Sequence, residues 1–344
     1  MIRIAHLLDD MAMGGVTRSL TLFDDPRLAS RTVSTVIPMK RRMQDAPVLD
    51  ADLIVSHVPP CWSRLPYLAM LRRRNRHARI VHVEHSYTRE FERRHVASEA
   101  RFRLLLRLAS GLVDEVVAVS HGQCAWLREV GINAAKLSII RPWSGRFELG
   151  QISDKTGHCG PLRLLAYGRL SEEKNFGDLI KAVGAFRPTE VELTLFGSGP
   201  LQVEFGELSA EFPNVFLHPA CSDPSPWLAQ CDAVVLPSLR EAFGLVATEA
   251  RMAGRAILVA DVDGLPEQAD AGGGMVAPMR SCEEIIRAIS AFAHRDSCAM
   301  GRAARRGVAG QHDEVIHGWM RIVERAEGIR ETLSPRKPPI PACT

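Results

Sequence analysis

The sequence has little that would indicate a disulfide-bonded, metal-binding or membrane-spanning protein. Its eight cysteines are scattered, with no C-x-x-C pair and no histidine at zinc spacing, so neither a disulfide framework nor a zinc site is expected. No run of about 18 uncharged apolar residues occurs. The apolar run at the N-terminus is short and is soon followed by Asp9 and Asp10, unlike a signal peptide. We therefore expect a cytoplasmic chain without a membrane span.

Several nucleotide and metal motifs are also missing. No G-x-x-x-x-G-K string is present, and Gln202 occupies the place of the third glycine in a dinucleotide fingerprint, which argues against kinases and dehydrogenases. Two D-x-D strings, at 50–52 and 261–263, lack the fold context of a metal-dependent transferase. No metal and no cofactor is therefore predicted.

The composition is that of an average soluble protein, with 46% hydrophobic and 24% charged residues, which excludes intrinsic disorder. A length of 344 residues suggests two domains. The net charge of +3 argues against a dedicated nucleic-acid binder. It conceals an asymmetry, because residues 1–150 carry 23 Lys and Arg against 15 Asp and Glu, whereas residues 151–344 carry 20 against 25. The halves are therefore +8 and −5.

Short apolar runs alternate with longer helical patterns, which is the βαβ rhythm of parallel sheets. The first series has strands near 2–8, 31–38, 52–58, 79–85 and 115–120, with helices at 98–110 and 121–130. The second has strands near 162–168, 191–196, 214–218, 232–236 and 256–260, with helices near 176–186, 200–211 and 243–253. Helical patterns at 281–293, 297–308 and 312–331 follow.

A stretch rich in glycine and proline separates the two series and has the composition of a linker. We predict an α/β fold with two doubly wound, Rossmann-like domains that face each other across a cleft. The expected divisions are an N-terminal domain at 1–145, a linker at 146–160, a C-terminal domain at 161–333 and a disordered tail at 334–344.

Two segments of the second series carry chemistry. In the first, a buried strand ends near Ser238, a loop carries Glu241, and a helix begins near Gly244 with Glu249 about two turns further on. The free amides at that helix start suit an anion, while flanking carboxylates suit sugar hydroxyls beside a phosphate. The alternative is an ordinary solvated helix start, because the helix dipole also favours acidic residues there.

The second segment, 168–176, follows the first strand of the C-terminal domain and places Arg169 and Lys174 at a strand-to-helix turn. Arg binds two phosphate oxygens in a fork and Lys supplies a mobile charge, so the pair suits a diphosphate leaving group. A solvated charge cluster beside Glu172 and Glu173 is the alternative.

Together these segments resemble the retaining glycosyltransferases of family 4, the group 1 nucleotide-sugar transferases with the GT-B fold. The resemblance covers most of residues 160–280 and is carried by four stretches, YGRLSEEKN at 167–175, LFGSGPL at 195–201, LPS through EA at 236–250, and GLPE at 264–267. The Glu pair of the family, separated by seven residues, falls on Glu241 and Glu249.

The resemblance implies roles for individual residues. Glu241 would lie at the donor sugar, Glu249 would contact the nucleotide ribose, and Arg169 and Lys174 would hold the diphosphate. The remaining expected donor-binding positions of this domain are Gly168, Ser198, Gly199 and the amides of Phe243, Gly244 and Leu245. The loops after Gly197 and Leu217 would cradle the base, but His218-Pro219 stands where glycine is more usual and leaves the base open.

The N-terminal half resembles the family more loosely. Gly14 and Gly15 follow the first strand, where backbone can approach a phosphate closely, and in the family this loop borders the donor diphosphate. His85 ends a strand at the expected cleft and is the candidate for a site histidine near the sugar, in preference to His82. Ser120-His121 is a further cleft candidate.

Basic and apolar residues are interleaved in the N-terminal half, as in a helix that lies on an anionic bilayer. A solvated helix face is the alternative. The residues concerned are Arg72, Arg73, Arg74, Arg76, Arg79, Arg89, Arg93, Arg94, Arg101, Arg103 and Arg107, with Phe91, Phe102, Leu104, Leu105, Leu106 and Leu108 among them.

The resemblance thus implies a metal-independent, retaining transferase that moves a sugar from a nucleotide-diphosphate donor to a hydroxyl of a glycan or lipid-linked acceptor. A UDP-sugar is favoured over a GDP-sugar, and bacterial cell-surface polysaccharide synthesis is the expected setting, with the enzyme cytoplasmic or peripheral at the inner membrane face. Glu241, Arg169, Lys174 and His85 are the expected catalytic residues. A nucleotide-sugar epimerase of the same double fold and a non-catalytic scaffold of a polysaccharide complex remain alternatives.

Overall fold

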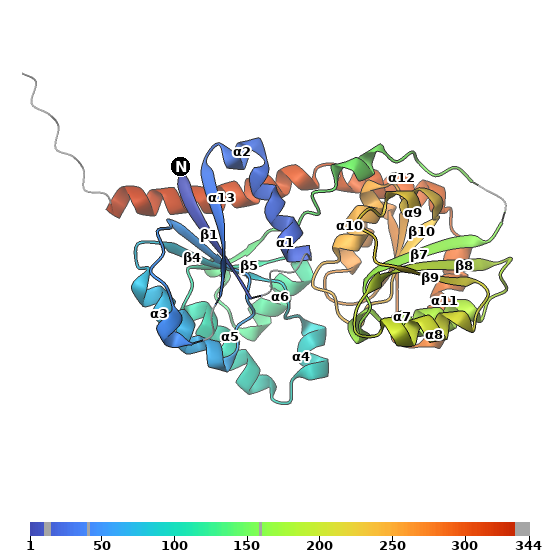
Figure 1. Ribbon diagram of the computed structural model, residues 1–344, viewed down its shortest axis with the longest axis horizontal. Helices are drawn as coiled ribbons and strands as arrows, with labels where there is room; N and C mark the ends of the chain where they lie inside the picture. Colours follow the sequence, from blue (N-terminus) through green and yellow to red (C-terminus); the bar gives the residue numbers. More distant parts are fainter. Residues whose placement is uncertain (10–14, 40–41, 158–159, 334–344) are drawn as a thin grey trace, which may run out of the picture.

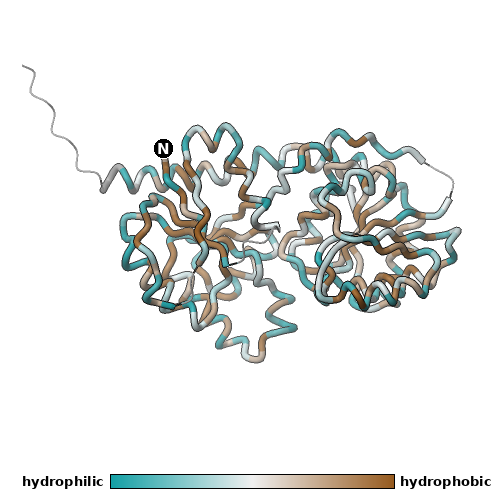
Figure 2. Tube along the Cα trace, in the orientation of Figure 1, coloured by the Kyte–Doolittle hydropathy of each residue, from teal (hydrophilic) through white to brown (hydrophobic). Residues whose placement is uncertain are grey.

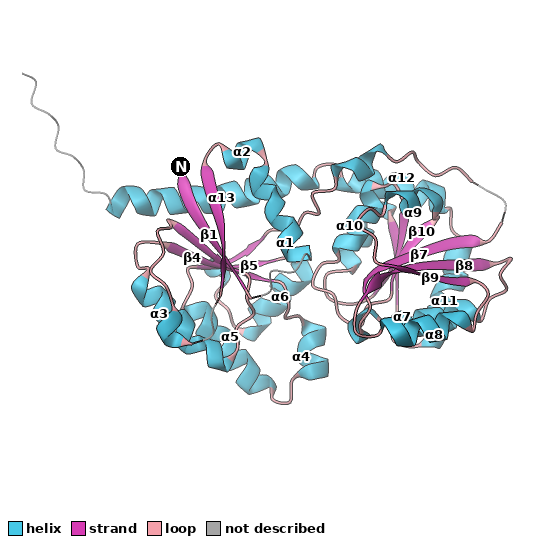
Figure 3. Ribbon diagram, viewed as in Figure 1, coloured by secondary structure: helices cyan, strands magenta, loops and turns pink. Residues whose placement is uncertain are grey.

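Two parallel β-sheets form the two halves of the molecule (Figure 1). The computed structural model describes residues 1–9, 15–39, 42–157 and 160–333. Within these residues each sheet has six strands, in the order β2-β1-β3-β4-β5-β6 in the N-terminal half and β12-β11-β10-β7-β8-β9 in the C-terminal half. Helices cover both faces of each sheet (Figure 3), so the predicted α/β class with two doubly wound domains is confirmed.

The elements of the N-terminal half begin and end as follows. The strands are β1 (Ile2–Leu8), β2 (Thr32–Pro38), β3 (Leu53–Ser56), β4 (Arg79–Glu84), β5 (Glu115–Ala118) and β6 (Leu137–Ile139). The helices are α1 (Gly15–Ser19), α2 (Pro26–Ala29), α3 (Leu65–Arg74), α4 (Arg89–His95), α5 (Glu99–Gly111) and α6 (His121–Val130).

The C-terminal half repeats this alternation. Its strands are β7 (Leu162–Arg169), β8 (Val191–Ser198), β9 (Val215–Pro219), β10 (Ala233–Leu236), β11 (Ala256–Ala260) and β12 (Gly274–Ala277). The helices that follow the linker are α7 (Phe176–Gly184), α8 (Gln202–Ala210), α9 (Ser225–Gln230), α10 (Leu245–Met252), α11 (Cys282–Ala293), α12 (Ser297–Val308) and α13 (Gln311–Leu333).

Burial explains why the central strands are continuously apolar. Every residue of β3, β10 and β11 is buried, because helices cover both faces of the sheet at these positions. The strands are correspondingly the most hydrophobic part of the trace, while hydrophobic and hydrophilic residues alternate along the outer helices (Figure 2). No helix in the described ranges is both long and apolar enough to span a bilayer.

Helix α13 corrects the expected division into domains. Although it was assigned with residues 161–333 to the C-terminal domain, it packs against α2 and β1 and runs along the N-terminal sheet (Figure 1). Arg325 of α13 also forms an ion pair of 2.8 Å with Glu115 at the start of β5. Its buried stripe consists of Val315, Ile316, Trp319, Ile322, Val323 and Ala326. The chain therefore crosses between the halves twice, once through the linker and once before α13.

The first part of the predicted linker is anchored to the C-terminal half, although most of its described residues are exposed. A short 3₁₀ helix spans Phe147–Gln151, and Leu149 within it is fully buried. Arg305 of α12 donates hydrogen bonds to the carbonyl groups of Gly150 and Ile152, which fixes the linker to the C-terminal half. The predicted tail at 334–344 lies outside the described residues.

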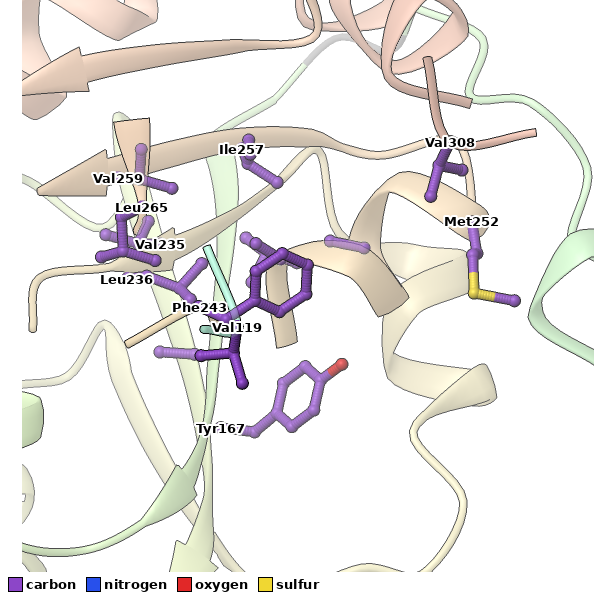
Figure 4. Close-up of a cluster of buried hydrophobic side chains, with 14 of the residues drawn as sticks. Val119, Tyr167, Val235, Leu236, Phe243, Met252, Ile257, Val259, Leu265 and Val308 are labelled. Atoms are coloured by element: carbon purple, nitrogen blue, oxygen red, sulfur yellow. The ribbon is translucent and has the colours of Figure 1, made fainter. Parts of the chain in front are cut away.

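A buried apolar cluster continues from the C-terminal core to the N-terminal half. Figure 4 shows Phe243 of the C-terminal half beside Val119, which follows β5, and Leu265 belongs to the same buried cluster. All three side chains are buried. The loops that end the strands of the two sheets are thus packed against each other, which fixes the site residues they carry.

Candidate functional site

The predicted site residues lie at the carboxyl ends of parallel strands, where the loops of such a sheet gather. Arg169 ends β7 and Ser198 ends β8, and Glu241 lies in the loop after β10. On the N-terminal side, His85 directly follows β4 and Ser120 follows β5. This edge of the C-terminal sheet faces the N-terminal half, as the contacts described below show.

The structure brings Lys174 and Glu241 together. The Lys174 ammonium group donates a hydrogen bond to Oε2 of Glu241 and forms an ion pair with it, across 67 residues of sequence. Both side chains are partly exposed. The pair places a mobile cation and an acidic hydrogen-bond acceptor side by side, which are the groups needed for a phosphate oxygen and a sugar hydroxyl.

Arg169 differs from Lys174 in being exposed and unpaired. In the described part of the chain, no hydrogen bond or ion pair involves its guanidinium group. Its backbone is fixed, since Arg169 pairs with Ser198 in the parallel register of β7 and β8. An unpaired guanidinium group held on a rigid strand end is available to an anionic ligand.

The start of α10 offers free amides. Gly244 adopts a left-handed conformation with φ of 89°, and a Cβ there would lie 2.7 Å from Cδ2 of Leu265. No side chain caps the helix, and among the described residues the amides of Phe243, Gly244 and Leu245 have no hydrogen-bond partner. The Phe243 side chain is buried, so only the backbone of this residue can contact a ligand. These amides can receive an anion.

The glycine loop of the N-terminal half meets this helix start. A Cβ on Gly15 would lie 3.2 Å from Cδ1 of Leu245, so α1 and α10 approach each other across the two halves. Gly14 lies outside the described residues.

Glycines also let the ends of β7 and β8 approach closely. Gly197 pairs with Gly168 in the parallel register, and a Cβ on Gly197 would overlap the Gly168 carbonyl oxygen. A Cβ on Gly199 would likewise overlap the backbone of Leu170. The amide of Leu170 donates to the carbonyl of Ser198 at 2.9 Å. The loop after β8 is thus tied to the segment that carries Arg169.

Glu249 lies in a buried network rather than in an open pocket. Its side chain is 2% exposed, and its carboxylate accepts hydrogen bonds from the Tyr167 hydroxyl at 2.7 Å and from Arg18 at 3.2 Å. Nε of Arg146 lies 3.2 Å from Oε1 of Glu249. Burial raises the pKa of Glu249 despite these partners. The network joins α10, β7, the linker and α1.

Asp263 connects the two halves at the Glu241 loop. Its Oδ2 accepts from the amide of Glu241 at 3.1 Å, and its Oδ1 accepts from the amide of Glu90 in α4, also at 3.1 Å. Asp263 has a left-handed backbone, with φ of 47°. In the sequence, Asp263 stands out only as part of a D-x-D string without fold context. Its place three residues after the buried strand β11 was the available signal.

The Ser120-His121 candidate is also used for the contact between the halves. Ser120 is buried and caps α6 by accepting from the amide of Gln123 at 3.1 Å. The amide of His121 donates to Oε2 of Glu267 at 2.9 Å. These residues therefore fix the position of the N-terminal half against the GLPE stretch.

His85 belongs to a row of three histidines. His57 is hydrogen-bonded to His85 on one side and to His6 on the other, with nitrogen–nitrogen distances of 3.0 and 3.1 Å. His82 instead contacts the carbonyl of Ser56 and Oε2 of Glu84, away from this row. His85 was predicted as a site residue, but His6 in β1 and His57 after β3 were not.

A metal site is not formed by the described residues, in which no group of three or more His, Cys, Asp or Glu side chains could hold an ion. The string at 50–52 has a different use, because Asp50 and Asp52 pair with Arg3 of β1.

Comparisons with known proteins agree with this geometry. Residues 9–143 match the family described as Glycosyltransferase Family 4, and residues 161–295 match that described as Glycosyl transferases group 1. Among curated relatives, a D-inositol 3-phosphate glycosyltransferase of Streptomyces bingchenggensis is 32% identical over 29% of this chain and 22% of its own length. A glycogen synthase of Mycobacterium tuberculosis is 30% identical over 45% of this chain and 40% of its own length. The matches thus span less than half of these relatives.

Solved structures share the fold over nearly the whole chain. HepE of Anabaena, solved in complex with UDP and glucose, has a TM-score of 0.74 at 18% identity and covers 95% of this chain and 100% of that one. Sucrose-phosphate synthase of Thermosynechococcus elongatus has a TM-score of 0.70 at 18% identity, covering 97% and 99%. Family models match each half of the chain, and solved GT-B structures match its fold as a whole. The chain therefore belongs to the group 1 glycosyltransferases of the GT-B type.

Proposed function

We propose that this glycosyltransferase moves a sugar, with retention of configuration, from a UDP-sugar to a hydroxyl of a glycan or lipid-linked acceptor in bacterial cell-surface polysaccharide synthesis. The observation that carries the proposal is the grouping of Arg169, the Lys174–Glu241 pair and the free amides of α10 at one sheet edge. The UDP complexes of HepE, a protein of the same fold, support the choice of donor.

In the proposed mechanism, positive charge stabilises the departing diphosphate. Arg169 binds its oxygens in a fork, Lys174 adds a second cation, and the amides from Phe243 to Leu245 supply oriented dipoles. Glu241 accepts hydrogen bonds from the sugar hydroxyls and orients the ring. The acceptor oxygen bonds to the anomeric carbon on the face from which the diphosphate departs, and the bond between that carbon and the phosphate oxygen breaks. The leaving phosphate takes the acceptor proton, so neither a carboxylate nucleophile nor a metal ion is required.

Donor binding tests the proposal first. A thermal-shift series with UDP-, GDP- and ADP-sugars should single out UDP-sugars, because a ligand at 100 times its Kd stabilises the folded state by about 2.7 kcal/mol. Arg302→Ala, which alters an exposed arginine of α12, is the control and should leave the shift unchanged. Absence of a shift with every nucleotide sugar would contradict the proposed donor site.

Product analysis separates transfer from the two alternatives. An epimerase would release a changed nucleotide sugar without any acceptor, which chromatography detects. A scaffold protein would bind the donor and release no nucleotide diphosphate even with acceptors supplied. The proposed transferase releases UDP only when an acceptor hydroxyl is present.

The exposed side chains of α5 support the predicted contact with an anionic bilayer. Several of the arginines named in that prediction are instead paired with carboxylates. Arg93 and Arg94 pair with Glu90, and Arg103 pairs with the buried Glu92. These side chains therefore stabilise the fold of the N-terminal half. On α5 and beside it, the exposed side chains include Leu104 and Leu108, at 45% and 47% exposure, Trp62 at 38%, Arg107, and Arg101, whose guanidinium group lies 5.5 Å from the Trp62 ring centre. Arg73 and Arg76, at the end of α3 and just after it, are exposed as well.

We propose that this surface contacts an anionic bilayer. The protein should co-sediment at low salt with vesicles containing phosphatidylglycerol but not with phosphatidylcholine vesicles. Because each cation near the surface contributes about 1 kcal/mol, Arg101→Ala with Arg107→Ala should weaken binding roughly 30-fold. Replacing Arg302 and Arg321, exposed arginines of the C-terminal helices, is the matched control. Equal sedimentation of both double variants would contradict this surface.

A further inference from the structure

Three histidine side chains form a continuous row from the N-terminal core toward the site. His6 lies in β1, His57 follows β3 and His85 follows β4, so neighbouring strands supply successive rings. Nδ1 of His6 lies 3.1 Å from Nε2 of His57, and Nδ1 of His57 lies 3.0 Å from Nε2 of His85. Adjacent rings stack with their centres 5.3 Å apart. His57 and His85 line a hollow with Ser19, Arg141 and Trp143.

All three rings are neutral near pH 7. Burial lowers the pKa of His6 to about 3 and that of His85 to about 4, and it holds the pKa of His57 well below 6.5. A neutral imidazole has one N–H group and one acceptor nitrogen. If His57 donates a hydrogen bond through Nδ1, it must accept one through Nε2. If it donates through Nε2, it must accept through Nδ1.

Two arrangements therefore satisfy both hydrogen bonds. In one, each ring carries its proton on Nδ1, so that His6 donates to His57 and His57 donates to His85. In the other, each ring carries its proton on Nε2 and both hydrogen bonds run in the opposite direction. The arrangements differ at the two ends of the row, Nε2 of His6 and Nδ1 of His85.

The buried end decides between them. Nε2 of His6 is buried and has no hydrogen-bond partner among the described residues, and the His6 ring is 1% exposed. The second arrangement would leave an N–H group there without an acceptor, whereas the first leaves only an unused acceptor nitrogen. Orphaned buried N–H groups are the rarer defect in folded proteins. The first arrangement is therefore favoured.

We infer that His6 and His57 act as positioning residues, which hold His85 as a neutral hydrogen-bond donor whose Nδ1–H is directed to substrate oxygen. The inference rests on the proposed function for the role of His85 in the cleft. Its consequence is specificity for an acceptor atom at that position, such as a sugar hydroxyl or phosphate oxygen. Reversing the donor while keeping both hydrogen bonds would require all three rings to change tautomer together, so a change of tautomer in one ring alone cannot reverse it.

Histidine tautomers are measurable directly. In protein labelled with ¹⁵N-histidine, two-bond correlation spectra should show His6, His57 and His85 protonated on Nδ1 at pH 7. Single variants assign the signals. His294→Gln, at an exposed histidine after α11, serves as the control and should leave these three signals unchanged. Protonation of His85 on Nε2 in the wild-type protein would overturn the inference.

Variants of His57 test whether this residue orients His85 or only fills space in the core. His57→Asn places an amide N–H near the former Nδ1 and should keep His85 protonated on Nδ1, while His57→Leu removes the donor and should give a mixture of tautomers. We expect kcat to fall by roughly 10- to 100-fold in the leucine variant, as for other orienting partners, and to be largely restored in the asparagine variant. His6→Phe, which keeps an aromatic ring beside Phe23, should also give mixed tautomers at His85.

The outcomes distinguish this inference from the proposed function. Equal kcat in the leucine and asparagine variants, with folding shown by unchanged amide spectra, would overturn positioning by His57. Loss of folding in the leucine variant leaves His6→Phe as the test, and unchanged His85 tautomers there would overturn the relay. A wild-type protein with the expected tautomers but no transfer of sugar from any nucleotide donor would instead contradict the proposed function.

Discussion

Replacement of Lys174 by alanine should lower kcat for sugar transfer by about 10²–10³-fold, the usual effect of removing one group that stabilises charge in a transition state. The variant loses a cation and also leaves Glu241 unpaired beside the diphosphate, where its negative charge opposes departure of the leaving group. Arg169→Ala should cause a loss of similar size, because its guanidinium group has no protein partner in the described residues. Steady-state release of UDP measures both.

A double-variant cycle separates the two effects of losing Lys174. If repulsion from Glu241 contributes, Lys174→Ala combined with Glu241→Gln should be less impaired than the product of the single losses. Lys181→Ala, which removes an exposed lysine of α7, is the matched control and should retain full turnover. Full activity in Lys174→Ala would contradict any role of this residue in stabilising the leaving group.

The sheets could be predicted from the sequence because their central strands are continuously apolar. Strands such as β3 and β10 are buried on both faces, and this environment requires apolar residues at every position. The assignment of α13 could not be predicted in the same way. Its apolar stripe shows that one face is buried, but the stripe carries no information about which sheet covers it. Its place on β1 became visible only in three dimensions.

The site was predictable where function depends on local segments. The Lys174 turn and the start of α10 each lie within one short stretch, and their residue types indicate the chemistry directly. The contacts between the halves depend on long-range pairs instead. Arg18 reaches Glu249 across 231 residues of sequence, and Asp263 meets the amide of Glu90 across 173. No local pattern specifies such partners, so neither Arg18 nor Asp263 was proposed from the sequence.

Loss of the Glu249 carboxylate should cost the protein much of its stability. Removing one partner of a buried ion pair typically lowers the free energy of unfolding by about 3–5 kcal/mol. Glu249→Ala would leave the Tyr167 hydroxyl without its acceptor and would remove the nearer of the two carboxylates paired with Arg146, inside a network that joins both halves. We expect a fall in Tm of roughly 4–7 °C by calorimetry, because a chain of 344 residues has a large entropy of unfolding. Glu207→Ala, at an exposed glutamate of α8, should change Tm little.

Glu249→Gln tests charge apart from shape. Because burial raises the pKa of Glu249, the folded state binds this proton more tightly than the unfolded chain does. The protonated carboxyl group therefore contributes stability that is fully present below its usual pKa of 4.5 and is lost as pH rises through the folded value. Glutamine does not titrate, so the wild-type advantage in Tm over this variant should shrink as the pH rises above 4.5. An advantage that grows with pH would contradict the predicted direction.

The same variant tests the ribose contact that family resemblance implies. Oε2 of Glu249 is engaged by Tyr167, and Oε1 by Arg18 and Arg146, so a ribose hydroxyl would have to share or displace one of these partners. Displacing Arg18 would break a contact between the halves, which makes donor binding and domain arrangement interdependent. A ribose contact predicts that Glu249→Gln weakens UDP binding by calorimetry as well as lowering Tm. Unchanged UDP affinity with a lowered Tm would assign Glu249 to the contact between the halves alone.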